Sequence, residues 1–369
     1  MIAVAALRTL GRRARTGPGG ALLMQVIPHQ RWARRGHRLV GQMGSSFSHL
    51  MRRAVGLAGW LFPRANAEDN HGIASSRAST ATVDARPTES PITSASGLRV
   101  ARLLSSVLAL VMVAASIAGM GFRGLYREPS SVAAMLRGYD LVVLVVAVPL
   151  LVATLVPARR ESPRLQLLWV SMLAYSAYNY AVYVFGTAFN AAFLLHVAAF
   201  SLSVYALALA LAGLDIPGIA RRFRISTPAR LIAGVLTFLA AGLGGMWVFF
   251  SLRFAITGAR PGESLLVLPL AGVHLGYVLD LALLVPAYAA AAVLLWRRAA
   301  WGYVLAGVLL PFTVVYQLNY VTALLFQSWA KVPGAVAFDR QEVPIIAATL
   351  AATVLLLRNL RDNNDEVGR

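Results

Sequence analysis

From residue 103 onward, long apolar runs alternate with short polar connections that are rich in arginine. A membrane-spanning helix needs about 20 predominantly apolar residues. By this measure the pattern predicts an all-α fold, a polytopic transmembrane helix bundle of about eight spans that occupies residues 101–360. The predicted spans are 103–121, 140–157, 166–187, 189–212, 230–252, 275–296, 303–326 and 343–358.

The first 100 residues follow a different pattern, with 14 arginines and only four acidic residues. Between Phe47 and Phe62 apolar residues recur at helical spacing, and Pro63 ends the segment. We therefore predict that residues 1–63 form a basic cytoplasmic tail, in which an amphipathic helix lies on an anionic membrane surface. Residues 64–100 are rich in Ser, Thr, Ala and Pro, which predicts a disordered linker. The alternative is a start codon further downstream, which would remove part of the tail.

The composition supports the assignment to membrane proteins. Of the 369 residues, 58% are hydrophobic and 13% are charged, which is about half the charged share of a soluble domain. The chain has no cysteine, which excludes disulfides, thiolate metal sites and a cysteine nucleophile. Nearly all of the positive charge is arginine, and Ala and Gly are abundant, as is typical of bacteria with GC-rich genomes.

The positions of Arg and Lys predict the orientation, because cytoplasmic loops carry an excess of these residues. If the N-terminus is cytoplasmic, the inner side carries 12 of them outside the tail and the outer side carries seven. We therefore predict a bacterial inner (plasma) membrane protein with both termini cytoplasmic, including a short C-terminal tail over 361–369. The net charge of +19 then indicates anionic lipid headgroups as partners of the basic tail, and no nucleic acid.

Tryptophans near the predicted span boundaries fit the aromatic belt of membrane proteins. Trp169, Trp296 and Trp301 fall at the inner boundary, and Trp247 and Trp329 fall near the outer one.

An internal match at an offset of 140 residues suggests that the bundle consists of two four-helix repeats. Asp140-Leu141 aligns with Asp280-Leu281, and Asn179-Tyr180 aligns with Asn319-Tyr320. Nine of the 41 positions in this window are identical, and Asp, Asn and Tyr are uncommon in membrane spans. The alternative is a chance match between two apolar sequences.

Two aspartates, Asp140 and Asp280, stand at the outer ends of the second and sixth predicted spans. An Asp at the start of a helix can cap its amide groups and meet the positive end of the helix dipole. The functional alternative is an ion or proton site at the outer mouth. Both helices also contain a proline, Pro149 and Pro286, and interrupted helices at corresponding positions of two halves are typical of transporters.

Further polar residues fall at a similar depth, in the outer half of the predicted bundle. Polar side chains within a span are costly and usually face the bundle interior. They either form hydrogen bonds that hold the helices together or line a cavity open to the outside. The second interpretation predicts a binding site for a small solute formed by Asp140, Tyr178, Asn179, His196, Asp280, Gln317, Asn319 and Tyr320.

No motif identifies an enzyme class. His196 is alone on its helix and no His-x-x-x-His or Glu-x-x-His spacing occurs, so we predict no metal site. There is no Walker loop, dinucleotide-binding glycine fingerprint or Gly-x-Ser-x-Gly elbow, so no cofactor is predicted. In the fifth span, Ala240 with Gly244 and Ala241 with Gly245 have the small-residue spacing that lets helices pack closely.

One segment reads Tyr178-Asn-Tyr-Ala-Val-Tyr-Val-Phe-Gly-Thr-Ala-Phe-Asn190, and Tyr277-Val-Leu-Asp-Leu281 and Trp296-Arg-Arg follow later in the chain. With these segments, residues 103–358 resemble uncharacterised bacterial multi-pass membrane proteins. The resemblance implies a bacterial inner-membrane protein, and it does not extend to the basic tail. It implies no activity and no catalytic residue.

These features leave three functional hypotheses. The first is a small-solute transporter or permease with an outward-facing polar site, which rests on the repeats, the interrupted helices and the grouped polar residues. The second is an intramembrane enzyme in which His196 or Asp280 acts as acid or base, and it requires one of them in a cleft. The third is a non-catalytic membrane scaffold or partner protein that acts through its basic tail. We favour a transporter over an enzyme.

Overall fold

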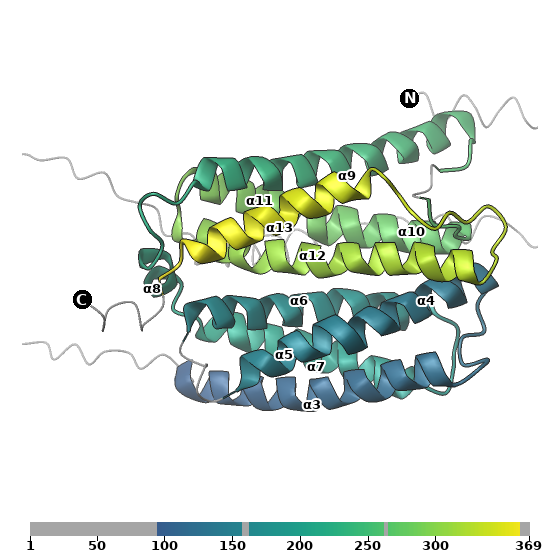
Figure 1. The fold of residues 1–369 in the computed structure, drawn as a ribbon, viewed down its shortest axis with the longest axis horizontal. Helices are drawn as coiled ribbons and strands as arrows, with labels where there is room; N and C mark the ends of the chain where they lie inside the picture. The colour runs from purple at the N-terminus through teal and green to yellow at the C-terminus, as the bar shows by residue number, and fades with distance from the viewer. Residues whose placement is uncertain (1–93, 157–161, 262–264, 362–369) are drawn as a thin grey trace, which may run out of the picture. The chain divides into compact units, whose positions relative to one another are not determined.

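The computed structural model describes residues 94–156, 162–261 and 265–361 (Figure 1). The tail and amphipathic helix predicted over 1–63 lie outside the described residues, as does the C-terminal tail beyond Arg361. The linker predicted over 64–100 also lies outside them, except that its last residues begin the first described helix. The regular elements of the described residues are all helical, which confirms the all-α fold class.

The helices follow one another along the chain and are connected by short segments. They are α3 (Ser94–Gly121), α4 (Ser130–Val142), η2 (Val143–Ala147), α5 (Val148–Leu155), α6 (Pro163–Gly186), α7 (Phe193–Gly213), α8 (Ile216–Arg221), α9 (Ala229–Thr257), α10 (Leu270–Leu279), η4 (Asp280–Leu284), α11 (Val285–Trp296), α12 (Ala300–Trp329) and α13 (Glu342–Arg358).

Six of these helices are long and apolar enough to cross a membrane, which fits an integral membrane protein. They are α3, the continuous helix α4–η2–α5, α7, α9, the continuous helix α10–η4–α11, and α12. Helices also lie at the two remaining predicted positions, but neither meets both requirements. Helix α6 has 24 residues and carries several Tyr, Ser and Asn side chains, and α13 has only 17 residues. The predicted count of about eight spans is therefore not confirmed.

The helices form two groups that lie side by side (Figure 1). In the first group α7 packs against α3 and α6, and the α4–η2–α5 helix packs against the same two helices. In the second group α11 packs against α9 and α12, and α12 packs against α13. The groups meet where α12 contacts α4 and α6, and where α6 contacts α10. Four helices, α4, α6, α10 and α12, therefore surround the centre of the molecule.

A π-helical turn interrupts one long helix in each group: η2 in the first and η4 in the second. A proline follows two residues after each turn, Pro149 in α5 and Pro286 in α11. Proline lacks an N–H, and its ring clashes with the carbonyl of the preceding turn of an α-helix. The wider π-helical turn accommodates the proline, and it also rotates the following side chains onto a different face of the helix.

The predicted helix-capping role of the two aspartates is wrong. Helix α4 begins at Ser130 and α10 at Leu270, each directly after a proline. Asp140 and Asp280 therefore lie ten residues beyond the first helical residue, roughly 15 Å along the helix. At that depth the backbone amides are already paired within the helix, so both carboxylates need other donors.

One of the two small-residue pairs in α9 lies at a helix contact. Ala240 and Gly244 are buried, and a Cβ atom on Gly244 would lie 3.0 Å from Val285 of α11. This pair lets α9 approach α11 closely, as predicted. Ala241 and Gly245 are exposed in the structure, so the second pair does not pack in this way.

Candidate functional site

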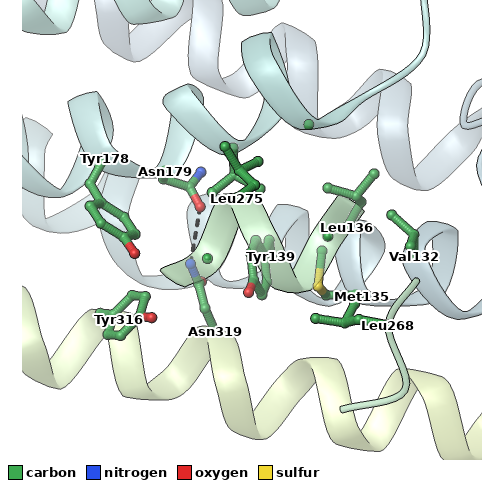
Figure 2. A pocket seen from close by; sticks show the side chains of 14 residues that line it. Val132, Met135, Leu136, Tyr139, Tyr178, Asn179, Leu268, Leu275, Tyr316 and Asn319 are labelled. Atoms are coloured by element: carbon green, nitrogen blue, oxygen red, sulfur yellow. Dashed lines mark hydrogen bonds between the residues drawn. The ribbon is translucent and has the colours of Figure 1, made fainter. Parts of the chain in front are cut away.

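A cavity of about 80 Å³ lies between the two helix groups, bounded by α4, α6, α10, α12 and the connection before α10 (Figure 2). This is room for several water molecules. Apolar side chains form most of the wall, and tyrosine and asparagine side chains supply the polar groups. The lining residues are Val132, Met135, Leu136, Tyr139, Tyr178, Asn179, Val182, Gly186, Leu268, Gly272, Leu275, Gly276, Tyr316 and Asn319.

Two asparagines join the helix groups beside this cavity. Asn319 Nδ2 of α12 donates to Asn179 Oδ1 of α6 over 3.0 Å, as Figure 2 shows. Tyr175 in turn donates its hydroxyl to Asn319 Oδ1 over 2.9 Å. Both asparagines are buried. Asn179 Nδ2 makes no hydrogen bond to any of the described residues. A residue of the cavity wall thus carries a buried amide nitrogen without a hydrogen-bond partner in the described part of the chain.

Asp280 is one hydrogen bond removed from the cavity. Its Oδ1 accepts from Tyr178 over 2.5 Å and from Tyr316 over 3.4 Å, and both tyrosines line the cavity. Its Oδ2 accepts from the Trp247 indole N–H over 2.9 Å. An ionised carboxylate is an acceptor only, with room for about four hydrogen bonds. Three donors that converge on one buried carboxyl therefore suit its charged form, and these partners are all neutral.

Asp140 forms a separate centre inside the first helix group. Tyr126, in the connection before α4, donates to Asp140 Oδ2 over 2.6 Å. The Tyr183 hydroxyl of α6 shares its proton between Asp140 Oδ1 and Leu136 O, each over 3.0 Å. Gly119 of α3 leaves room for the carboxyl, because a Cβ atom there would collide with Oδ2. Burial, and then the Asp140 charge, raise the pKa of Tyr126. The phenol therefore stays protonated and acts as a donor.

The residues predicted to line a single polar cavity are divided among several places. Tyr178, Asn179 and Asn319 line the cavity, and Asp280 is joined to it through Tyr178. Asp140 belongs to the other centre, where its donors are Tyr126 and Tyr183.

The remaining three predicted residues lie outside the cavity wall. His196 is buried in the first group, where its ring centre lies 4.8 Å from that of Tyr183. Gln317 is buried on α12. Tyr320 donates its hydroxyl over 2.9 Å to Asp339, in the connection between α12 and α13. These side chains lie at a similar depth along their helices, but they project from different sides of them and therefore reach different places.

Only some of the tryptophans predicted to lie at the membrane boundaries are exposed. Trp296 and Trp329 are 56% and 69% exposed, as residues of a belt should be. Trp247 is only 8% exposed and donates to Asp280, and Trp169 is 2% exposed in the core. Trp247 is therefore a part of the Asp280 centre, although its position in the sequence predicts a place at the membrane boundary.

Three tyrosines that contact the carboxylates were also absent from the predicted site: Tyr126, Tyr183 and Tyr316. The available signal was the density of tyrosine in α6, which places four of them between Tyr175 and Tyr183. Phenols are the donors that a buried carboxylate needs when no cation is bonded to it.

Gln327 of α12 fixes the connection that borders the cavity. Its Nε2 donates to Ser131 O over 2.9 Å and to Val267 O over 3.0 Å, and its Oε1 accepts from Val267 N–H over 3.0 Å. We expect Gln327→Leu to leave these backbone groups unpaired. Hydrogen exchange of residues 265–269, measured by mass spectrometry, should become roughly tenfold faster or more.

Gln317→Leu provides the control for this experiment. Gln317 is also buried on α12, but its Oε1 has no hydrogen-bond partner within the described part of the chain. Its replacement should therefore leave the exchange of residues 265–269 unchanged. Equal exchange rates in the two variants would show that Gln327 does not hold this connection.

The described residues contain no group of three His, Cys, Asp or Glu side chains that could hold a metal ion. Comparisons of the chain with protein-family models, with curated proteins and with solved structures found no match.

Proposed function

We propose that the chain is a small-solute transporter or permease whose polar site is the cavity between the two helix groups. The observation that carries the proposal is a cavity lined both by Asn179, whose amide nitrogen is unpaired within the described residues, and by Tyr178, whose hydroxyl donates to the Asp280 carboxylate. Transporters bind their solutes near the middle of the membrane, at the interface of their repeats and beside interrupted helices. The amide, phenol and carboxyl groups suit a small polar solute.

Matched positions in the two groups support the proposed four-helix repeats. The first residues of α4 and α10 are 140 residues apart, as are Asp140 and Asp280. Asn179 and Asn319, also 140 residues apart, hydrogen-bond to each other across the junction of the groups. Each group also places a π-helical turn and a proline in its second long helix. This agreement favours an internal duplication over a chance match.

We also propose that α6 and α13 cross the membrane and bring the number of spans to eight. The polar side chains of α6, including Tyr175, Asn179 and Tyr183, are buried by neighbouring helices. A span covered in this way need not be apolar on every face. The Arg and Lys distribution then favours cytoplasmic termini, a bacterial inner membrane, and a basic tail bound to anionic lipid headgroups.

The two rival functions have less support from the site. An intramembrane enzyme would need its acid or base in a cleft, but Tyr178 and Tyr316 stand between Asp280 and the cavity. His196 does not line the cavity. A scaffold that acts through its basic tail would lose its function when residues 1–97 are deleted, whereas solute binding in the bundle should survive this deletion.

Filling the cavity tests the proposed function. Gly276 lines the cavity, and a Cβ atom added there meets nothing within 4 Å. Gly276→Phe should therefore fold, while its ring occupies the space of the solute. We expect solute uptake by proteoliposomes to fall at least about tenfold, which corresponds to a binding loss of about 1.4 kcal/mol. The measurement uses the purified full-length chain and a panel of labelled amino acids, sugars and small organic cations.

Gly245→Phe is the matched control, because Gly245 is exposed on α9 and its added Cβ atom also meets nothing within 4 Å. This variant should take up the solute as fast as the unmodified protein. The proposal fails if Gly276→Phe transports normally, or if the unmodified protein takes up no member of the panel.

A further inference from the structure

The Asp140 carboxylate accepts fewer hydrogen bonds than an ionised carboxylate has positions for. Asp280 accepts hydrogen bonds from three side chains, whereas Asp140 accepts them from only two, Tyr126 and Tyr183. Both aspartate residues are only 2% exposed. Because an ionised carboxylate has about four acceptor positions, Asp140 retains free lone pairs where water has little access. A buried charge in this state is costly unless something pairs with it.

Two hydroxyl groups beside Asp140 also lack partners. Ser116 of α3 is 0% exposed and Tyr180 of α6 is 1% exposed, and neither hydroxyl makes a hydrogen bond within the described residues. The Ser116 hydroxyl lies within reach of both the Asp140 carboxyl and the Tyr180 hydroxyl, although neither contact has the geometry of a hydrogen bond. Buried polar groups nearly always have partners. A carboxylate and two hydroxyls that are all incompletely bonded therefore indicate an occupant between α3, α4 and α6.

We propose that this place is a binding site for one small monovalent cation. The single carboxylate matches one positive charge, and the ligands would be carboxylate, serine and phenol oxygens. Hard oxygen ligands suit a sodium ion or a proton, whereas transition metals favour nitrogen or sulfur. A sodium ion held by these oxygens and a proton held on the carboxyl neutralise Asp140 equally. The site lies apart from the cavity, so it does not depend on the proposed function.

The surroundings contain one charged side chain that would compete with the cation. Arg137 precedes Asp140 by about one turn of α4, but in the structure no hydrogen bond joins it to Asp140, and its Nε has no partner among the described residues. The other titratable groups that face the centre are phenols and one imidazole. They are Tyr126 from the connection before α4, Tyr175, Tyr180 and Tyr183 from α6, and His196 from α7, which lies against Tyr183.

Thermal unfolding of the purified full-length protein tests the proposal. Tryptophan fluorescence is followed in sodium, potassium and choline chloride at equal ionic strength, over a pH series around neutrality. Because a ligand that binds only the folded state stabilises it, sodium should raise the melting temperature above its value in choline by roughly 5–10 °C. If the cation is a proton, lowering the pH should give this rise and sodium should have no effect.

Asp140→Asn removes the charge but keeps the shape, so it should abolish the shift, whichever cation causes it. Asp339→Asn removes an acid from an outer connection and should retain the shift. A shift of equal size in Asp140→Asn, or no shift with sodium or pH in the unmodified protein, would overturn the proposal. Asp140 would then be an acceptor for phenols and bound water only.

Tyr180→Phe supplies a second test that does not rely on Asp140→Asn folding normally. If nothing binds at this place, removal of an unpaired buried hydroxyl should be neutral or stabilising and should leave the cation-dependent shift unchanged. If the hydroxyl is a ligand, the shift should shrink by at least about half. An undiminished shift in this variant would count against the assigned ligands.

Discussion

Gly138→Val is expected to lower the melting temperature of the purified protein by roughly 5–10 °C. A Cβ atom on Gly138 of α4 would lie 2.8 Å from the carbonyl carbon of Thr322 and 2.9 Å from the amide nitrogen of Ala323 on α12. The Thr322 hydroxyl also lies 3.0 Å from Gly138 O, which is one of three backbone carbonyls within its hydrogen-bonding distance. Because backbone lies on the opposite side, no side chain can move away, and the valine must force the two helices apart.

Gly234→Val is the control for this prediction, because a Cβ atom on Gly234 of α9 meets nothing within 4 Å. At this exposed position of the helix the change should be neutral or slightly stabilising, since glycine is a poor helix former. Helices α4 and α12 carry the main contact between the two groups, and both line the cavity. Gly138→Val should therefore also weaken the proposed solute binding. Equal melting temperatures in the two variants would mean that the helices do not meet as closely as described.

The apolar runs are sufficient to predict where the long helices occur, but α3, α4 and α10 begin five to ten residues before the predicted starts. A helix lies at each of the eight predicted positions. Helix α4 begins at Ser130, ten residues before the predicted start at Asp140, because its first turns are packed against other helices and do not need to be apolar. The proline directly before Ser130 was the available signal, since proline is favoured next to a helix start.

The candidate site was predictable in part. Matching depths placed Asn179 and Asn319 together, and they do hydrogen-bond. Depth could not show which way each side chain points. Consecutive helical residues differ by about 100° in direction, so Tyr139 lines the cavity while Asp140 faces Tyr126 and Tyr183. Such a separation depends on how the helices rotate against one another, which the spacing of polar residues does not determine.

Tyr178→Phe is expected to destabilise the protein by about 1.5–3 kcal/mol, which is typical of a hydrogen bond to a charged group. The Tyr178 hydroxyl makes the shortest hydrogen bond to Asp280, 2.5 Å, and the change removes only this hydroxyl and keeps the ring. The ring still packs edge-on against Phe312 and Tyr316. The loss should therefore come from the buried carboxylate, and thermal unfolding should show it as a fall of roughly 5–10 °C.

Tyr316→Phe removes a hydroxyl from the same carboxylate, but over 3.4 Å, where a hydrogen bond is weak. This variant should lose less than about 1 kcal/mol. In an Asp280→Leu background, Tyr178→Phe should no longer cost more stability than Tyr316→Phe. The Tyr178 hydroxyl then has no carboxylate to donate to, so its removal should be neutral or stabilising. If Tyr178→Phe costs the same with and without the carboxylate, Tyr178 acts through its packing. The link from the cavity to Asp280, on which the proposed transport site depends, would then be absent.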